Sequence, residues 1–342
     1  MAAGSGRGGQ VRAVVLTAPR AVEVVHDWPE PQPGPHEVVV AMRGVGLCGS
    51  DLGVYQGERA TPSLPWVMGH EGGGVVVAVG AAVGDRKVGQ RVVVEPNYPC
   101  LACAHCRQGR TSSCPTRRVV GMNDPGLLAE RVAVPARFTW PVPETCSDLT
   151  VACIEPLAVA RSAVRRSGVT AGDSCLVVGA GSQGLLVCLA LRAVGVRPHV
   201  VEPHEGRRAL AADLGATVAD PRATSGFAYV FETAGVPAAW ETALSAVAPT
   251  GRLVLIGIGH EAVAVPIADL VRRQLSLQGM LIYDHPHDFA GTVAAVARGE
   301  VEPGRVVAAV HEPADAAAAF AEAPSVAGKS WIDLRIWQRD SL

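Results

Sequence analysis

CLVVGAGSQGLLVCLALRAVGV, residues 175–196, is the stretch that decides the fold of this 342-residue chain. It begins with four apolar residues, which predict a buried strand, and continues through G-x-G-x-x-G into a long apolar helix pattern. Glycines at such a turn let the backbone approach a pyrophosphate, and the free N–H groups at the start of the helix favour its negative charge. The stretch therefore predicts a strand, a turn and a helix that bind a dinucleotide.

Strand and helix patterns alternate after this stretch. The strand patterns lie at 198–202, 217–220, 228–235 and 251–259, and the helix patterns at 205–215 and 237–248. Such alternation predicts a doubly wound parallel sheet, and we expect a Rossmann domain over residues 158–298. Only residues 221–227 separate the third strand pattern from the fourth, which is too short for an ordinary crossover helix. We expect no helix there, so the Rossmann domain is shortened between strands 3 and 4.

A different pattern fills the N-terminal part of the chain. Short Val-rich runs lie between Gly and Pro turn signals, as in VRAVVLT, EVVVAMRGVG, GGGVVVAVG, GQRVVVEP and LLAERVAVP. These runs predict an all-β, barrel-like domain, so the fold class is α/β plus all-β. We expect this domain to span residues 11–157 and to be completed by short strands in 299–342. Residues 1–10 are Gly-rich and are expected to form a disordered tail.

The composition disfavours several classes of partner. The formal net charge is −2 at pH 7, and no block of like charge indicates binding to nucleic acid or to an anionic membrane surface. No apolar run reaches the roughly 18 to 20 residues that a membrane span requires. We therefore expect a soluble, cytoplasmic protein that acts on a small molecule.

Four of the nine cysteines lie within 15 residues of one another. Cys100, Cys103, Cys106 and Cys114 have the spacing C-x2-C-x2-C-x7-C. Four thiolates can complete a tetrahedron around zinc, which leaves no open position and is typical of a structural site. A four-cysteine iron–sulfur cluster is the chemical alternative, but its usual spacings differ from this one. The spacing predicts a structural zinc lobe over about residues 96–118.

A second set of metal-ligating residue types is scattered along the chain. Cys48 lies in GLCGSD, His70 and Glu71 are adjacent in GHEGGG, and Glu155 lies in IEPLAV. Each residue alone has an ordinary explanation, because cysteine is often a small buried hydrophobe and histidine is often a hydrogen-bonded core residue. Three protein ligands with one exchangeable position form the catalytic type of zinc site. We expect these residues to hold a catalytic zinc, and the identity of the carboxylate ligand stays open.

At these residues the chain resembles the zinc-containing medium-chain dehydrogenase/reductase family. The polyol, sorbitol-like and threonine dehydrogenase branches show C-G-S/T-D, G-H-E and E-P-L, and the resemblance extends over essentially the whole chain after the tail. It implies a GroES-like catalytic domain joined to a Rossmann domain, with the active site between them, in a homodimer or homotetramer. It also implies that Cys48, His70 and Glu71 occupy zinc positions and that Glu155 binds zinc directly or through its water. Ser50 is implied to take the proton of the substrate hydroxyl.

Two positions depart from the pattern of this family. Gly53 stands where many relatives carry the histidine that ends the proton relay. Ile282 stands where the polyol relatives carry an arginine before the tyrosine that is Tyr283 here. The candidate substrate contacts are Tyr55, Tyr283, Asp284 and His285, with His287, Trp66 and Glu95 as weaker candidates. The sequence therefore predicts familiar metal chemistry on an altered substrate.

The residues around the second cofactor strand indicate the type of nicotinamide. Glu202 ends that strand, where an acid accepts both hydroxyls of the adenosine ribose and repels a 2′-phosphate. Arg207 and Arg208 follow closely, and a guanidinium there is the alternative that would bind the phosphate. The sequence favours NAD and leaves NADP possible. The full set of candidate cofactor contacts is Gly179, Ala180, Gly181, Ser182, Gln183, Gly184, Glu202, Arg207, Thr233, Gly257 and Ile258.

The leading interpretation is a dehydrogenase with two zinc ions per chain that oxidises a secondary alcohol with NAD. The expected substrate is a polyol, a cyclitol or a compound similar to an amino sugar. The first alternative is an L-threonine or short-chain alcohol dehydrogenase. A second alternative, which Gly53 raises, is a regulatory protein that binds a nucleotide and is stabilised by zinc but has lost catalysis.

Overall fold

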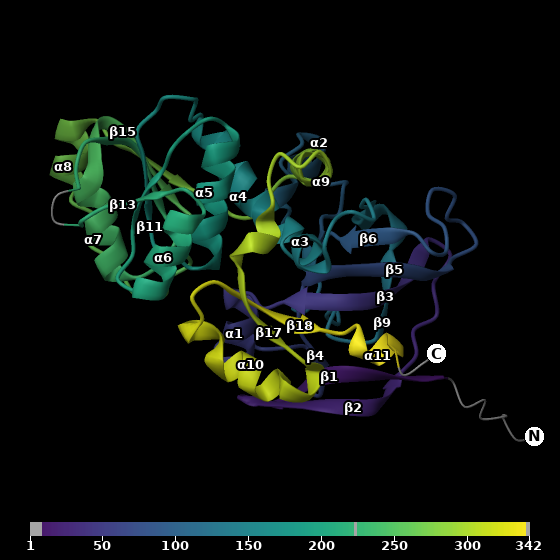
Figure 1. Cartoon of the computed structure of the whole chain (residues 1–342). Coiled ribbons are helices and arrows are strands. Elements are labelled where there is room, and N and C mark those ends of the chain that lie inside the picture. The colour runs from purple at the N-terminus through teal and green to yellow at the C-terminus, as the bar shows by residue number, and fades with distance from the viewer. Residues whose placement is uncertain (1–8, 222–223, 340–342) are drawn as a thin grey trace, which may run out of the picture.

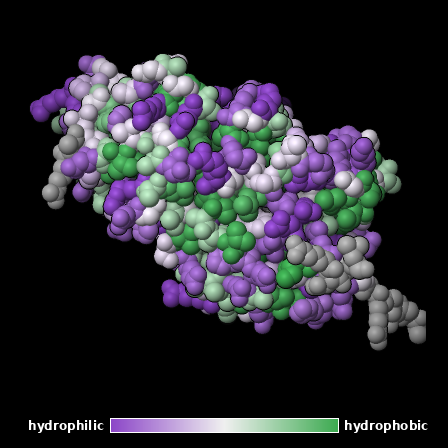
Figure 2. Space-filling model, viewed as in Figure 1, coloured by the Kyte–Doolittle hydropathy of each residue, from purple (hydrophilic) through white to green (hydrophobic). Residues whose placement is uncertain are grey.

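The computed structural model describes residues 9–221 and 224–339. The expected disorder of residues 1–8 lies outside this range, whereas Gln10, which the sequence analysis assigned to the tail, begins the first strand. Figure 1 shows two halves, one built on a parallel sheet with helices on its faces and the other built mainly of strands. In the space-filling view of the same face, hydrophilic residues lie between the apolar ones in both halves (Figure 2). Among the described residues, no helix is long and apolar enough to cross a membrane.

The parallel half contains six strands in the order β13-β12-β11-β14-β15-β16. Their bounds are β11 (Cys175–Val178), β12 (His199–Val201), β13 (Thr217–Val218), β14 (Phe227–Glu232), β15 (Val247–Leu255) and β16 (Ser276–Gly279). All neighbouring pairs are parallel. This order, 3-2-1-4-5-6 by strand, confirms the predicted doubly wound sheet. The link between β13 and β14 contains no helix in its described residues, as its length predicted.

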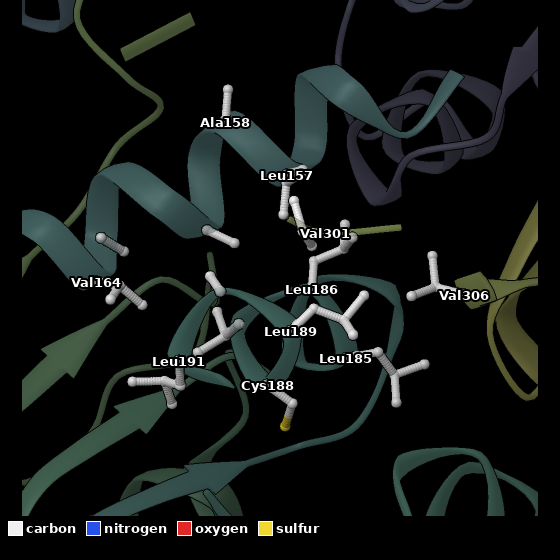
Figure 3. Packing of buried hydrophobic residues seen from close by; sticks show 14 of the residues in the cluster. Leu157, Ala158, Val164, Leu185, Leu186, Cys188, Leu189, Leu191, Val301 and Val306 are labelled. Atoms are coloured by element: carbon white, nitrogen blue, oxygen red, sulfur yellow. The ribbon is translucent and has the colours of Figure 1, made fainter. Parts of the chain in front are cut away.

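The helices of this half cover both faces of the sheet. They are α4 (Ile154–Ser167), α5 (Ser182–Ala193), α6 (Glu205–Asp213), α7 (Pro237–Ala246), α8 (Ile267–Arg273) and α9 (His287–Ala297). The packing of α4 on α5 forms much of the core, and Figure 3 shows Leu157 pointing toward Leu186 and Val301, all of them buried. The α4 helix was not predicted from the sequence, although Pro156 in its first turn is compatible with a helix start.

The strand-rich half contains two main sheets. A three-stranded sheet has the order β2-β1-β4, formed by β1 (Gln10–Ala18), β2 (Ala21–Pro29) and β4 (Trp66–Val67). The larger sheet has the order β10-β6-β5-β3-β18-β17, with β9 also pairing β3. Its strands are β3 (Glu37–Gly46), β5 (Glu71–Val79), β6 (Arg91–Val94), β9 (Arg131–Pro135), β10 (Thr139–Pro141), β17 (Val307–His311) and β18 (Lys329–Asp333).

The C-terminal segment returns to this larger sheet, because β18 pairs antiparallel with β3. In Figure 1 the yellow C-terminal elements accordingly lie against the purple N-terminal strands. The short helices of this half are α1 (Gly49–Gln56), α2 (Ala104–Arg107), α3 (Asp148–Ala152), α10 (Ala316–Glu322) and α11 (Ile336–Arg339). A small ribbon of β7 (Asn97–Tyr98) and β8 (Arg118–Val119) brackets the four predicted zinc cysteines. The predicted combination of an α/β half and a β-rich half is confirmed.

Candidate active site

Two adjacent strands bring a cysteine, a histidine and a glutamate together. Cys48 follows β3, His70 directly precedes β5, and Glu71 begins β5. The pairing of Gly46 with Glu71 across these strands sets their register. One ligand atom of each of the three residues lies within 4.8 Å of the other two. Sulfur, imidazole nitrogen and carboxylate oxygen are all zinc donors, so the donor set of this cluster fits a mononuclear zinc site.

Asp51 orients two of these groups and was missed by the sequence analysis. Its fully buried carboxylate accepts the Cys48 N–H (3.0 Å) and the Gly69 N–H (3.2 Å), and it lies 3.1 Å from Nδ1 of His70. Burial alone would lower the pKa of His70, but the Asp51 carboxylate raises that pKa well above its ordinary value. A metal-binding histidine usually donates its second ring N–H to a carboxylate in this way, which leaves Nε2 for the metal. The signal in the sequence was an acid three residues after Cys48, at the start of a helix.

Glu71 has a buried lysine as its partner. Lys329 of β18, one of only two lysines in the chain, forms an ion pair with Glu71 and also donates to the Leu47 carbonyl oxygen at 3.2 Å. Burial lowers the pKa of Lys329, whereas the Glu71 carboxylate raises it, and the net direction is upward. The pair leaves no room for a side chain at Gly46, where a Cβ would lie 2.8 Å from Glu71 Oε2. The ammonium group of Lys329 therefore compensates the negative charge of Glu71 at Oε2.

Glu155 lies at the start of α4 with different partners. Its Oε1 accepts a hydrogen bond from the Asn97 amide at 3.3 Å, and the same amide donates to the Tyr283 hydroxyl oxygen at 2.9 Å. All three side chains are buried. The pKa of Glu155 is raised to about 7, mainly by burial; His70 acts to lower it and Glu71 acts to raise it. The structure thus places Glu155 beside the cluster, with neutral hydrogen-bond partners.

Ser50 lies beside the same cluster. Its Oγ is 3.4 Å from Nε2 of His70, the nitrogen that Asp51 leaves available. Gly53 follows on α1, where an added Cβ would meet only Glu58 Oε2 at 3.9 Å. An added Cβ would therefore meet no steric barrier at this position, so nothing close to the backbone requires a glycine there.

The four cysteines of the second cluster also converge. Their sulfur atoms all lie within 4.8 Å of one another, and Cys100 Sγ is 4.0 Å from Cys106 Sγ. This separation is far above a disulfide bond and close to the roughly 3.8 Å edge of a zinc–sulfur tetrahedron with 2.3 Å bonds. Backbone N–H groups point at the sulfurs, and those of Ala102 and Cys103 lower the pKa of Cys100 to about 6. The cluster therefore fits a closed four-thiolate zinc site.

The glycine turn between β11 and α5 is shaped for close contacts. Gly179 has φ +94°, which favours glycine, and a Cβ at Gly184 would lie 2.0 Å from the Gly179 carbonyl oxygen. The Thr233 hydroxyl donates to the carbonyls of Val178 (3.1 Å) and Gly179 (3.0 Å), so β14 supports the turn. The remaining candidate contacts lie around the same end of the sheet: Ala180, Gly181, Ser182 and Gln183 in the turn and first helical residues, and Gly257 and Ile258 after β15.

The acid and the arginines after β12 are held by protein partners. Glu202 accepts the Ala180 N–H (2.7 Å) and the His204 N–H (2.9 Å), which places its carboxylate under the glycine turn. Arg207 donates to the carbonyls of Pro324 and Val326 in the other half of the molecule. Arg208 donates to the carbonyl of Glu202 at 3.0 Å and to that of Pro203.

The candidate substrate contacts do not form one group. Tyr55 stacks on Phe320 with ring centroids 5.3 Å apart, and only Tyr283 reaches Glu155 through the Asn97 amide. Asp284 accepts the Ser112 N–H at 2.9 Å, and His285 Nδ1 lies 2.9 Å from Glu95 Oε2. The weaker candidates are also accounted for. His287 is exposed, and the buried Trp66 donates to the Gly121 carbonyl at 2.9 Å.

Replacement of Asp51 by Asn should weaken zinc binding at the Cys48 cluster by about 10- to 100-fold, because an amide orients and polarises His70 less well than a carboxylate. Zinc titration against a competing chelator measures this affinity. The exposed Asp85, changed to Asn, is the matched control and should leave the affinity unchanged. An Asp51→Asn protein with the affinity of the control would contradict the assignment.

Lys329→Met should destabilise the metal-free protein by about 3–5 kcal/mol, because Glu71 would be left buried without its cation. The loss should be smaller when zinc is present, since the metal supplies the missing positive charge. Thermal unfolding of both forms measures the difference, and Lys329→Arg is the conservative control. Equal losses with and without zinc would show that Glu71 does not face the metal.

Comparisons with known proteins match both halves of the chain. Residues 34–144 match the alcohol dehydrogenase GroES-like domain, and residues 184–298 match the zinc-binding dehydrogenase domain. The 2-dehydro-3-deoxy-L-galactonate 5-dehydrogenase of Pseudoalteromonas atlantica is 32% identical over 85% of this chain and 88% of its own length. A sorbitol dehydrogenase of Arabidopsis thaliana is 34% identical over 74% of this chain and 76% of its own.

A solved structure shows the same arrangement of elements. The 2R,3R-butanediol dehydrogenase of Bacillus subtilis superposes with a TM-score of 0.85 at 28% identity, covering 94% of this chain and 99% of its own. Together with the cysteine, histidine and glutamate cluster and the glycine turn, these matches establish the family. The chain belongs to the zinc-containing alcohol dehydrogenases of the medium-chain dehydrogenase/reductase family, enzymes that transfer a hydride between an alcohol and a nicotinamide cofactor.

Proposed function

We propose that this enzyme oxidises a secondary hydroxyl of a polyol, a cyclitol or a sugar-derived compound to a ketone, with NAD as the hydride acceptor. The observation that carries the proposal is the cluster of Cys48, His70 and Glu71 with Ser50 beside it, in a chain that also has a dinucleotide-binding turn. The named relatives act on a sugar acid, on sorbitol and on a vicinal diol, all of which carry secondary hydroxyls.

In this proposal Cys48, His70 and Glu71 hold a catalytic zinc, with Glu155 beside it, and Cys100, Cys103, Cys106 and Cys114 hold a structural zinc. A bound catalytic zinc would supply a Lewis acid that makes the substrate hydroxyl easier to deprotonate. Asp51 holds His70 in the orientation that presents Nε2, and Ser50 lies where its hydroxyl can accept the proton of the substrate. The Glu71–Lys329 ion pair limits the negative charge around the substrate oxygen.

The preference for NAD is supported by the region after β12. Glu202 keeps lone pairs available for ribose hydroxyls after accepting its two backbone N–H groups, and its charge would repel a 2′-phosphate. Arg207 would have to leave the carbonyls of Pro324 and Val326 to bind that phosphate. The cost of breaking these contacts favours NAD over NADP.

The substrate side of the site supports a substrate other than sorbitol itself. Ile282, which replaces the arginine of polyol relatives, packs on the apolar core of the cofactor half instead of presenting a charge. Asp284 and His285, predicted as substrate contacts, have protein partners in this structure. Tyr283, Asn97 and Glu155 are the polar groups that remain near the metal cluster, and they suit a substrate with neighbouring hydroxyls.

Oxidation should be detected as reduced nicotinamide absorbance when the enzyme is given NAD with a panel of polyols, cyclitols, sugar acids, amino sugars and L-threonine. We expect the highest kcat/KM with a secondary alcohol that carries a neighbouring hydroxyl, and we expect NADP to be the poorer cofactor. A chelator that removes one zinc per chain should abolish the activity. A protein that holds two zinc ions and binds NADH but oxidises nothing on the panel would instead favour the non-catalytic alternative.

We also propose that two copies associate through the outer edge of the parallel sheet. β16 is the terminal strand of that sheet and pairs only with β15 among the described residues. Exposed apolar side chains accompany it, including Ile267 (65%), Val271 (69%) and Leu277 (38%). An unpaired edge strand with exposed apolar side chains on and beside it invites pairing, so a second copy is a suitable cover. Figure 1 shows α8 at the end of the molecule remote from the cysteine lobe.

Light scattering coupled to gel filtration tests this arrangement. Leu277→Asp combined with Val271→Asp should convert the assembly to a species with about half its mass, because each charge would be buried in the interface. Val88→Asp, at an exposed valine of the strand-rich half, is the control and should keep the mass of the unmodified protein. A monomeric unmodified protein, or a double variant of unchanged mass, would contradict the proposal.

A further inference from the structure

The segment that carries Tyr283 is anchored to the cysteine lobe, residues 96–118. Asp284 accepts the Ser112 N–H at 2.9 Å, and the His285 N–H donates to the Thr111 hydroxyl at 2.6 Å. The Thr111 hydroxyl in turn lies 3.4 Å from the His285 carbonyl oxygen. Thr111 and Ser112, two successive residues of the lobe, therefore hydrogen-bond to His285 and Asp284, two successive residues of the segment.

Tyr283 itself is held by the lobe as well. Asn97 belongs to β7 at the base of the lobe, and its amide donates to the Tyr283 oxygen (2.9 Å) and to Glu155 Oε1 (3.3 Å). The tyrosine is only 1% exposed and its ring packs against Phe289. Because one amide serves both groups, a shift of the lobe would move Tyr283 and Glu155 together.

A further contact fixes the next residue. His285 Nδ1 lies 2.9 Å from Glu95 Oε2, which also accepts the Trp140 indole N–H at 2.7 Å. Glu95 is fully buried. Its contact with His285 ties the segment to the strand that leads into the lobe, so the segment has partners both at the base of the lobe and at its tip.

The backbone of the segment is strained at the residue before the tyrosine. Ile282 has φ +46°, a left-handed conformation that a β-branched residue rarely adopts. Such a conformation persists only where surrounding contacts impose it, and it is found mostly at functional sites. The contacts of Asn97, Thr111 and Ser112 with the following three residues supply that constraint.

The residues that hydrogen-bond to the Tyr283 segment directly adjoin the cysteine cluster. Thr111 and Ser112 lie in a 3-10 helix (Thr111–Ser113), and the N–H of Cys114, the next residue and a member of the cluster, donates to the Thr111 carbonyl at 3.1 Å. A metal held by Cys114 and its three partners would therefore fix the turn at Thr111 and Ser112, which hydrogen-bonds to Asp284 and His285. The hydrogen bonds of the lobe are therefore not confined to the lobe itself, because they reach Tyr283, Asp284 and His285 on the substrate side of the active site.

We propose that the cysteine lobe is a positioning element of the active site, and that Asn97, Thr111 and Ser112 transmit the state of its metal cluster to Tyr283 and Glu155. The proposal rests on the proposed function for the identity of the active site, but the contacts it invokes belong to this chain alone. Loss of metal from the four cysteines would loosen the Tyr283 segment before it affected the Cys48 cluster or the cofactor turn. Alcohol binding would then weaken while cofactor binding stayed unchanged.

Thr111→Val tests this hydrogen bond directly, because valine keeps the shape of threonine but removes the hydroxyl that binds the His285 N–H. We expect faster hydrogen exchange in the peptide spanning 280–289 and an alcohol KM that rises about five- to tenfold, the size of a lost buried hydrogen bond. The NADH dissociation constant and the zinc content should not change. Ser113→Ala, an exposed position in the same turn, is the matched control.

Cys103→Ser and Asp284→Ala extend the test if the threonine variant folds poorly. Cys103→Ser should lower the zinc content by one ion per chain and accelerate hydrogen exchange in the same peptide. Asp284→Ala should accelerate exchange in that peptide while both zinc ions stay bound. Hydrogen exchange needs no substrate, so it tests the proposal even if the enzyme oxidises no compound on the panel. Exchange and KM values equal to those of Ser113→Ala in all folded variants would overturn the proposal.

Discussion

The burial of unequal charge around Cys48 and His70 is the constraint on which the rest of the structure depends. Asp51, Glu71 and Glu155 are each at most 4% exposed, whereas Lys329 is the buried lysine beside them. Burying carboxylates costs several kcal/mol each unless a cation or hydrogen bonds compensate them. A divalent zinc ion among these groups would balance the excess negative charge. The buried carboxylates therefore make the site costly to fold without metal and also suit it to bind one. The pKa values of both His70 and Glu155 are raised: that of His70 by the Asp51 carboxylate, against the effect of burial, and that of Glu155 mainly by burial itself.

The larger sheet meets this constraint through its strand order. β5, β3 and β18 are neighbours, and Gly46 pairs both with Glu71 and with Trp331. Cys48, Glu71 and Lys329 therefore meet although 258 residues separate the last two. The C-terminal segment must return to the sheet to supply the lysine, so the active site is complete only when the whole chain has folded. The cysteine lobe adds a second connection, since Asn97 and Thr111 reach the segment that follows the parallel sheet.

The sequence predicted the parts of this structure that depend on local spacing. The glycine turn, the alternation of parallel strands with helices and the missing helix between β13 and β14 follow from short motifs and segment lengths. Asp51 was missed because an acid at a helix start usually only caps the helix. Lys329 and Asn97 were missed because their partners are far away in the sequence, and pairing at such distance is set by the tertiary fold. Asp284 and His285 were predicted as substrate contacts because polar residues after a cofactor strand often face a cleft; here Asp284 accepts a hydrogen bond from Ser112 of the lobe, and His285 contacts Glu95.

Anomalous scattering at the zinc absorption edge, from crystals of the purified enzyme, tests the central claim most directly. The account predicts two zinc ions per chain, one within four sulfurs at Cys100, Cys103, Cys106 and Cys114 and one bound by Cys48, His70 Nε2 and a carboxylate. A single zinc ion confined to the four cysteines, with the Cys48 cluster unoccupied in zinc-saturated protein, would contradict it.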